Sequence, residues 1–372
     1  VEVAPALQNL GLELIATGGT LKTLRGSGLE VLDIQDVTGF PEICEGRVKT
    51  LHPKVHGGLL GRRDSEEHMA QLAENGIQTI EMVCVNLYPF EATIAKEGVT
   101  MEDAVENIDI GGPSMLRSAA KNFRDVTVVC DPSDYANIIE EITANGNTLP
   151  ETRLKLSAKA YTHTALYDSH IATYMRKAAG LDEKLFLSFD AIQTLRYGEN
   201  PHQAATFYRG PEEVSYSVAH ARQLGGKELS YNNIQDANAA LNIVREFAEP
   251  FCVALKHMNP CGAGIGNDLL EAWTRAYEAD KVSIYGGIVA MNRPLTAEVA
   301  RLMKPIFLEI VMAPSFEPEA LEVLASKKNL RLLEVTMDNV KAPQKQYVGV
   351  NGGMLVQDAD IECKEITADM CV

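Results

Sequence analysis

Residues 12–34 read LELIATGGTLKTLRGSGLEVLDI, and this stretch decides the fold class. The apolar run at 12–16 is typical of a strand, TGGT turns at 17–20, 21–25 is helical, and 29–34 is a second strand-like run. A strand, a helix and a strand in this order build a parallel sheet, because the helix returns the chain to the starting edge. The sequence therefore predicts an α/β domain, and similar strand patterns recur at 82–85 and 126–130.

The pattern changes near residue 180. Residues 152–179 form one long helical pattern with few breakers, and Gly180 and a polar stretch follow it. We place a boundary near 180–195 and expect one domain over 1–185 and a second over 190–372. The second domain is expected to hold helices at 234–247 and 269–278, strands at 253–255, 284–291, 306–311 and 330–335, and one short strand after Val348.

The composition restricts the classes of function. The chain of 372 residues has a formal net charge of −17 and no dense basic run, which argues against general nucleic-acid binding. The 7 cysteines lack paired CxxC spacing, which indicates neither a disulfide framework nor a zinc site and favours a reducing cytoplasm. No leader and no membrane-spanning apolar run is visible, so neither export nor a membrane partner is expected.

The turn Thr17-Gly18-Gly19-Thr20 joins a strand to a helix. Its glycines let the backbone approach a ligand, while its hydroxyls and the helix N-terminal amides suit a phosphate. An ordinary βα turn is the alternative, because the sequence is neither GxGxxG nor a Walker loop.

Residues 46–58, GRVKTLHPKVHGG, are much denser in charge. Arg47 can hold a phosphate with its planar fork, and Lys49 adds a point charge on the same side of an extended backbone. We expect a polyanion pocket, with a solvated basic loop as the alternative. His52 and His56 have the spacing of metal ligands on a helix, yet a proline lies between them and no carboxylate is near, so no metal is expected.

Asn86 and Tyr88 follow the strand at 82–85. They are expected at the carboxyl edge of the sheet, where open α/β sheets bind ligands, although Tyr88 can equally cap the core.

A helix that begins after Asp109 carries Ser114, Arg117 and Lys121 on one face. A lysine near Arg117 that is partly desolvated releases its proton more easily, which favours proton transfer near neutral pH. A solvated helix face is the alternative.

Residues 253–264, VALKHMNPCGAG, run from a buried-looking strand into Lys256 and His257. Both side chains are costly to bury without partners. Either they form a satisfied structural pair, or the strand delivers a cation and a base to a site.

Several blocks occur in an order that resembles one known family: TGGT, GRVKTLHPKVHGGLLGRR, NLYPF, IDIGGPSMLRSAAKN, LRYGENPHQ, SYNNIQDA and ALKHMNPCG. The chain is similar, over nearly its whole length, to the bifunctional purine biosynthesis enzymes, phosphoribosylaminoimidazolecarboxamide (AICAR) formyltransferase/IMP cyclohydrolase. The resemblance implies a methylglyoxal-synthase-like parallel-sheet domain followed by a cytidine-deaminase-like α/β transformylase domain. It implies formyl transfer from 10-formyltetrahydrofolate to AICAR, cyclisation of the formylated product (FAICAR) to IMP, and a homodimer in the cytoplasm.

The resemblance also assigns roles to residues of the first domain. Lys49 would stabilise an oxyanion, Tyr88 and Lys121 would relay protons, and Asp109 would orient the attacking amide. The substrate contacts that it implies are Thr17, Gly18, Gly19, Thr20, Arg47, Val48, Thr50, Val85, Asn86 and Ile110.

In the second domain the resemblance makes Lys256 and His257 the catalytic pair. A zinc site like that of the deaminases is not expected, because Pro260-Cys261 lacks the second cysteine of PCxxC and no HxE precedes it. The ribotide contacts that the resemblance implies are Arg196, Tyr197, His202, Asn233, Gly286 and Glu309.

Compared with the family, the chain lacks the opening strand with its phosphate turn and a second deaminase-like lobe that carries most of the folate site. We therefore expect an incomplete transformylase domain with weak folate binding. The alternatives are a non-catalytic ribotide-binding or assembly fragment and, more remotely, a pyridoxal-phosphate lysine enzyme built on Lys256.

Overall fold

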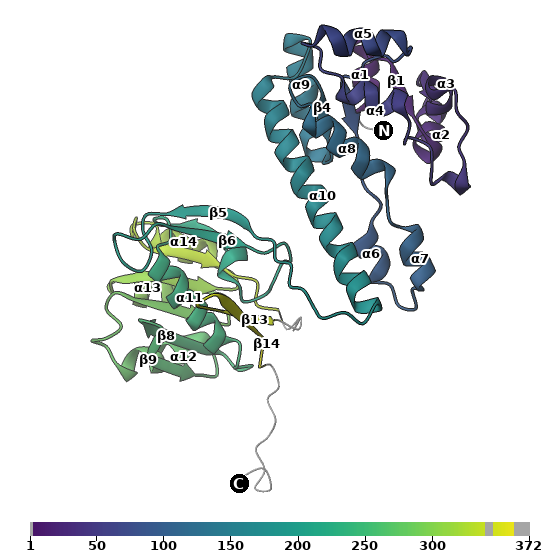
Figure 1. Ribbon diagram of the computed structural model, residues 1–372. Helices are drawn as coiled ribbons and strands as arrows, with labels where there is room; N and C mark the ends of the chain where they lie inside the picture. Colours follow the sequence, from purple (N-terminus) through teal and green to yellow (C-terminus); the bar gives the residue numbers. More distant parts are fainter. Residues whose placement is uncertain (1–2, 339–344, 361–372) are drawn as a thin grey trace. The chain divides into compact units, whose positions relative to one another are not determined.

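The computed structural model describes residues 3–338 and 345–360 (Figure 1). The chain divides into two compact units, Val1–Phe186 and Leu187–Val372, each with its own hydrophobic core. Within the described residues every helix is too short or too polar to span a lipid bilayer. The cysteines in these ranges are free thiols, whereas Cys363 and Cys371 lie outside the described residues.

Two pairs of parallel strands form the sheet elements of the first unit. β1 (Leu14–Ala16) pairs with β2 (Val31–Asp33), and β3 (Met82–Cys84) pairs with β4 (Thr127–Val129). The predicted parallel direction is confirmed. The strands are shorter than the apolar runs, and flanking residues such as Leu12 pack against the core beside them.

The first unit is mostly helical. The helix predicted at 21–25 begins earlier, so that the TGGT turn forms its N-terminus. The helices are α1 (Ala4–Asn9), α2 (Gly18–Gly26), α3 (Ile34–Thr38), α4 (Pro53–Leu60), α5 (Glu66–Glu74), α6 (Phe90–Ile94), α7 (Met101–Glu106), α8 (Gly111–Lys121), α9 (Tyr135–Asn145) and α10 (Pro150–Ala178), with 3-10 turns η1 (Cys44–Gly46) and η2 (Pro132–Asp134).

The core of this unit is built around α8 and α10, which Figure 1 shows in contact. Leu116 and Ala119 of α8 are fully buried and share one cluster with Leu156 and Ala160 of α10. This packing fixes both ends of α8, whose N-terminal end carries Gly111 and whose last residue is Lys121.

A buried arginine fixes the chain that leaves α8. The guanidinium of Arg153, in the first turn of α10, donates to the carbonyl oxygens of Phe123 at 3.0 Å, Arg124 at 2.9 Å and Thr148. These carbonyls have no helix or strand partner at that point, so the arginine supplies the donor for one buried and two half-buried acceptors.

A six-stranded mixed sheet forms the centre of the second unit, in the order β7-β12-β11-β10-β8-β9. β10, β11 and β12 are parallel, whereas β8 is antiparallel to β10, β9 to β8, and β7 to β12. The strands are β7 (Arg222–Gly225), β8 (Phe251–Lys256), β9 (Asn259–Ile265), β10 (Gly287–Met291), β11 (Leu308–Ala313) and β12 (Arg331–Glu334).

The helices of this unit contact that sheet or one another. α11 begins three residues before its predicted start, because Ser230 and Asn233 form a capping box at its N-terminus. The helices are α11 (Tyr231–Val244), α12 (Leu269–Ala279), α13 (Ala297–Met303) and α14 (Pro318–Leu324), with the 3-10 turn η3 (Val218–His220).

Two hairpins complete the described part of this unit. β5 (Asp190–Leu195) pairs with β6 (Ala205–Arg209), and β13 (Lys345–Val350) pairs with β14 (Gly353–Asp358). The short strand expected after Val348 is β14, and its partner β13, which begins before Val348, was not predicted. Asn351-Gly352, with Gly352 at φ +77°, is a two-residue turn of the kind that joins antiparallel strands.

β8 ends at Lys256, as predicted, and the stretch that follows the turn is a further strand, β9, which the sequence analysis did not predict. β9 runs antiparallel to β8, with Lys256 opposite Asn259. Its glycines let α12 lie directly on it: a Cβ on Gly262 would sit 2.0 Å from the carbonyl oxygen of Ala276. Gly264 is close-packed as well, since a Cβ there would sit 2.4 Å from the carbonyl oxygen of Ala272. The glycines therefore serve helix packing.

Gly262→Ala is expected to destabilise the second unit by about 1–3 kcal/mol, because the added methyl overlaps the backbone of α12. The chain has a single tryptophan, Trp273, which is buried on α12, so tryptophan fluorescence in a urea titration follows this unit alone. Gly349→Ala is the control, since a Cβ there meets nothing within 4 Å. Equal urea midpoints for the two variants would contradict the packing argument.

Candidate active sites

In the first unit the phosphate-type turn lies next to Lys49. Thr17 is the extended N-cap of α2, and Gly18 adopts φ +51°. A Cβ on Gly18 would lie 3.8 Å from Nζ of Lys49. Gly18, Gly19 and Thr20 are exposed in the first turn of α2, so their backbone amides and the Lys49 ammonium are available to one anion.

A strained loop presents the two candidate cations. An antiparallel bridge joins Ile43 to Val48, and between them Cys44, Glu45 and Gly46 all have positive φ. Non-glycine residues in this conformation are uncommon and gather at functional sites. The loop predicted over 46–58 is present only in part: Gly46 belongs to this strained backbone, whereas Pro53, Gly57 and Gly58 lie in α4.

Both cations are held by carboxylates. Nζ of Lys49 lies 3.1 Å from Oε1 of Glu42, and the guanidinium of Arg47 pairs with Glu106. A phosphate that binds here exchanges these weak, partly exposed ion pairs for a more highly charged partner.

The start of α8 lies next to the same loop. A Cβ on Gly111 would lie 2.7 Å from the hydroxyl of Thr50. The Asp109 carboxylate accepts the main-chain N–H of Gly112 at 2.8 Å and that of Tyr88. The main-chain N–H of Asp109 donates to the Tyr167 hydroxyl at 2.7 Å. Burial raises the pKa of Asp109, and the two backbone hydrogen bonds oppose that rise.

The remaining predicted residues of this group lie at its surface. The Tyr88 and Ile110 side chains are 52% and 57% exposed, and Asn86 is exposed as well. Val85 is half-buried, and its N–H donates to the carbonyl oxygen of Val129 at 2.9 Å. The structure therefore brings four segments of the first unit close together: the TGGT turn at 17–20 and residues 47–50, 86–88 and 109–111.

Lys121 does not belong to this group within one chain. It is the last residue of α8, so it lies about 15 Å along the helix axis from Gly111. Its side chain is exposed, which differs from the expected partial desolvation, and Arg117 stacks over the ring of Tyr161 at 5.3 Å.

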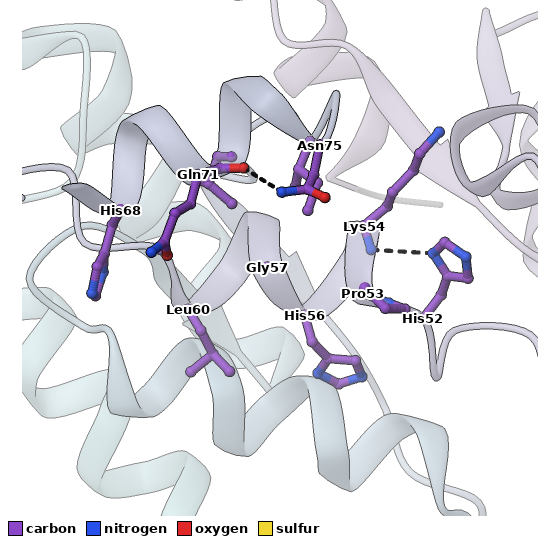
Figure 2. Close-up of a pocket in the computed structure, with 12 residues that line it drawn as sticks. His52, Pro53, Lys54, His56, Gly57, Leu60, His68, Gln71 and Asn75 are labelled. Atoms are coloured by element: carbon purple, nitrogen blue, oxygen red, sulfur yellow. Dashed lines mark hydrogen bonds between the residues drawn. The ribbon is translucent and has the colours of Figure 1, made fainter. Parts of the chain in front are cut away.

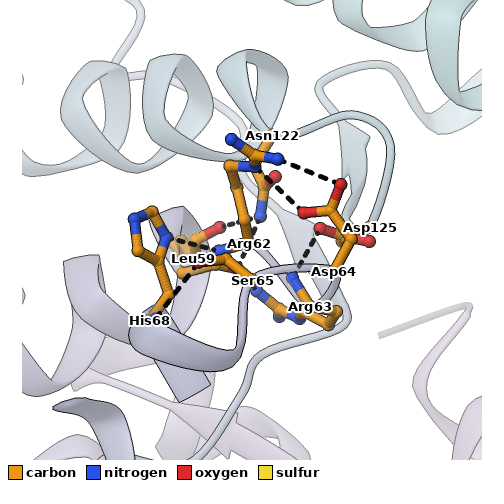
Figure 3. A network of polar contacts seen from close by, with 9 residues as sticks. Leu59, Arg62, Arg63, Asp64, Ser65, His68, Asn122 and Asp125 are labelled. Atoms are coloured by element: carbon orange, nitrogen blue, oxygen red, sulfur yellow. Dashed lines mark hydrogen bonds and ion pairs between the residues drawn. The ribbon is translucent and has the colours of Figure 1, made fainter. Parts of the chain in front are cut away.

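Lys121 instead lines a cavity of about 660 Å³ with Arg62, Asp64, His68 and Arg124. Figure 3 shows the polar network at this cavity, in which the Arg62 guanidinium pairs with Asp64. The Asp125 carboxylate accepts the main-chain N–H of Arg63 at 3.1 Å. Of the cations that line this cavity, Arg62 thus has a carboxylate partner.

A second cavity of about 660 Å³ lies over α4 and α5, with His52 and His68 at opposite ends of it (Figure 2). Nδ1 of His52 accepts the N–H of Lys54 at 3.1 Å, which makes His52 the N-cap of α4. The Ser118 hydroxyl donates to Ser114, so Nδ1 of His56 donates to Ser118 at 3.0 Å. Burial lowers the pKa of His56, which disfavours the protonated ring.

In the second unit one edge of the sheet collects most of the predicted residues. β8 runs opposite to β10 and β11, so the end of β8 with Lys256 meets the starts of β10 and β11 with Gly286 and Glu309. Nζ of Lys256 donates to the Tyr285 carbonyl at 3.1 Å, and the N–H of Gly286, at φ +75°, donates to Phe307 at 2.7 Å.

A buried polar group joins this edge to α11. The side-chain amide of Asn233 donates to Oε2 of Glu309 at 2.9 Å, and the Arg331 guanidinium lies 3.4 Å from the same oxygen. Burial lowers the pKa of Arg331, and the charge of Glu309 opposes that shift. Arg331 was not predicted from the sequence. The feature that could have indicated it is a cationic residue at the start of an apolar strand.

His257 forms the tip of the β8–β9 hairpin with Met258. Both residues have positive φ, 52° and 60°, although neither is glycine. The Asp236 carboxylate of α11 accepts the Met258 N–H at 2.8 Å.

Arg196, Tyr197 and His202 lie in the loop between β5 and β6. Arg196 and His202 are exposed and Tyr197 is half-buried. Among the described residues no hydrogen bond or ion pair joins this loop to Lys256, His257 or Glu309.

Comparisons with known proteins cover both units. The family model described as AICARFT/IMPCHase bienzyme matches residues 119–371, and a model described as MGS-like domain matches residues 1–114. The chain is 57% identical over 362 residues to a protein of Bacillus cytotoxicus named bifunctional purine biosynthesis protein PurH, covering 97% of this chain and 71% of that one. The chain belongs to the AICARFT/IMPCHase bienzyme family. A PurH of Bacillus mycoides is 58% identical with the same coverage.

Among solved structures, one described as the crystal structure of ForH is 39% identical, with a TM-score of 0.42 over 46% of this chain and 88% of that one. The MGS-like match of this bienzyme chain contains the whole group of TGGT, 47–50, 86–88 and 109–111. Lys121 and the sheet-edge group fall within the bienzyme match. Within the described residues no three His, Cys, Asp or Glu side chains are grouped to hold a metal ion.

Proposed function

We propose that this chain catalyses the last two steps of IMP biosynthesis: formyl transfer from 10-formyltetrahydrofolate to AICAR, and cyclisation of FAICAR to IMP with loss of water. The observation that supports this most is the match to the bienzyme family together with 57% identity over 97% of the chain to a named PurH. The non-catalytic fragment is not better supported, because candidate residues for both reactions are present.

We assign cyclisation to residues 1–185 and formyl transfer to residues 190–372. In cyclisation the carboxamide nitrogen of FAICAR attacks its own formyl carbon, an oxyanion forms, and water leaves. Lys49 stabilises the oxyanion, and Asp109, held by the backbone of Gly112 and Tyr88, orients the amide. Tyr88 and Lys121 relay protons. Lys121 lies at the far end of α8 from Asp109. A proton relay through Lys121 therefore needs its ammonium to lie closer to FAICAR than its position within one chain allows.

The phosphate of the ribotide is bound by the TGGT turn with Arg47 and Lys49. The nearness of Gly18 to Lys49 supports this assignment. Base-side contacts are Val85, Asn86 and Ile110, and further backbone or hydroxyl contacts come from Val48 and Thr50. Since the reaction is intramolecular, positioning by these contacts supplies a large share of the acceleration.

In formyl transfer the exocyclic amine nitrogen of AICAR attacks the formyl carbon of 10-formyltetrahydrofolate. A nitrogen–carbon bond forms, the bond to the folate nitrogen breaks, and the amine proton passes to the departing folate. His257 takes the amine proton, and Lys256 stabilises charge near the departing nitrogen. Asn233, Gly286 and Glu309 contact the ribotide from the sheet edge, and Arg196, Tyr197 and His202 contact it from the β5–β6 loop.

We assign the active form to a homodimer in the cytoplasm, in keeping with the family resemblance. The substrates are AICAR, FAICAR and 10-formyltetrahydrofolate, and no nucleic acid or metal takes part.

Lys49→Ala is expected to lower the turnover of FAICAR to IMP by about 100- to 1000-fold, because it removes the cation that stabilises the oxyanion. Formyl transfer to AICAR should stay unchanged in the same variant, since Lys49 belongs to the first unit. Both rates are measured on the purified chain, with exposed Lys96→Ala as the control. Equal loss of both rates would contradict the division of labour, and no turnover in the unmutated chain would favour the fragment.

A further inference from the structure

The tip of the β8–β9 hairpin is in an unfavourable conformation. Lys256 pairs with Asn259, which leaves His257 and Met258 as a two-residue turn with positive φ at both positions. Such turns normally use Asn-Gly or Asp-Gly, because side chains crowd the backbone there. A histidine and a methionine hold this conformation only if their surroundings impose it.

Two hydrogen bonds hold the turn. The Asp236 carboxylate accepts the main-chain N–H of Met258 at 2.8 Å, and the side-chain amide of Asn259 donates to the carbonyl oxygen of His257 at 2.7 Å. The Asn259 bond is local to the hairpin. Asp236 is the partner from outside it, and it comes from α11.

Asp236 is itself held in place. It stands one turn after Asn233, which is 6% exposed, closes the capping box of α11 and donates to Glu309 on β11. The first two turns of α11 therefore contact both β11 and the hairpin tip. Because Asn233 and Asp236 belong to the same helix, the Asp236 carboxylate helps to fix the position of the His257 turn relative to Glu309.

We propose that Asp236 is a positioning residue for formyl transfer: by holding the Met258 N–H it keeps the hairpin tip left-handed and so fixes the direction of the His257 imidazole. This proposal rests on the proposed role of His257. Asp236 acts through the backbone and does not touch the reacting atoms. If the turn relaxes to negative φ, the His257 Cα–Cβ bond changes direction. A displacement of the imidazole by about 1 Å is enough to lower the rate of formyl transfer strongly.

Asp236→Ala is expected to lower kcat for formyl transfer about 10- to 100-fold, with KM for AICAR changed less than about threefold. Asp236→Asn keeps an oxygen acceptor and should stay within about fivefold of the parent chain. Asn238→Ala, an exposed position on the same helix, is the matched control. FAICAR cyclisation by the first unit, measured on the same samples, should stay at the parent rate and reports that the chain is intact.

Met258→Gly in the Asp236→Ala background provides the decisive comparison. Glycine adopts positive φ without crowding, so the double variant should recover most of the lost kcat if Asp236 serves the turn. Failure to recover, with the turn restored, would overturn the proposal in favour of a direct role for Asp236 at the substrate.

Amide hydrogen exchange across residues 256–259 separates this proposal from the proposed function. Asp236→Ala should raise exchange at this hairpin tip whatever reaction the chain catalyses, and unchanged exchange would overturn the proposal. If exchange rises while His257→Ala retains the full rate of formyl transfer, the role of His257 fails and the turn-holding role of Asp236 stands.

Discussion

His257→Ala is expected to lower formyl transfer by about 100- to 10 000-fold, which is the range for loss of a positioned general base. The amine of AICAR is a poor nucleophile, so its proton must leave as the bond to the formyl carbon forms. The measurement is kcat for AICAR formylation at saturating 10-formyltetrahydrofolate. FAICAR cyclisation in the same preparation should not change.

His220→Ala is the matched control, since that imidazole binds Ser217 within η3 and has no assigned role in the reaction. A rate for His257→Ala within threefold of the parent would remove His257 from the mechanism. It would return the Lys256-His257 pair to the structural alternative that the sequence left open.

Arg153→Met is expected to destabilise the first unit by about 3–5 kcal/mol. The substitution leaves the carbonyl oxygens of Phe123, Arg124 and Thr148 without their donor; the Thr148 contact is buried and the other two are half-buried, and a buried unsatisfied acceptor costs about 1–3 kcal/mol. The methionine retains much of the apolar volume, so lost packing contributes little.

The measurement uses the position of the single tryptophan. Far-UV circular dichroism follows both units in a urea titration, whereas Trp273 fluorescence follows the second unit. The variant should shift only the dichroism transition. Lys155→Met, at an exposed position on the same helix, is the control. A shift in fluorescence of equal size would show that Arg153 acts beyond its own unit.

The fold could be predicted where hydrophobic pattern and turn chemistry agree. Residues 12–34 carry apolar runs separated by glycine turns, and the parallel pair β1–β2 follows from them. β9 could not be predicted this way, because Asn259, Pro260 and two glycines lack the pattern of a strand. Their reason is the close approach of α12, which is a tertiary effect.

The candidate sites were predicted unevenly for a similar reason. Motifs that follow a strand or begin a helix, such as 47–50 and 109–111, lie close together. The short strands and helices of the first unit place these motifs at one site. Lys121 was grouped with them by helix face and by the family resemblance, and spacing along the axis of α8 separates it from them within one chain. Arg331 and Asp236 were missed, since each acts through a partner from another element.

Left-handed backbone at Cys44 and Glu45, beside Arg47, has a consequence for engineering this enzyme. Each such residue costs on the order of 1–3 kcal/mol, so glycine at 44 or 45 would raise resistance to heat. The same substitutions would loosen the loop that positions Lys49. Selection for heat stability alone is therefore expected to introduce glycine at these positions. The resulting variants would be more stable but would turn over substrate more slowly.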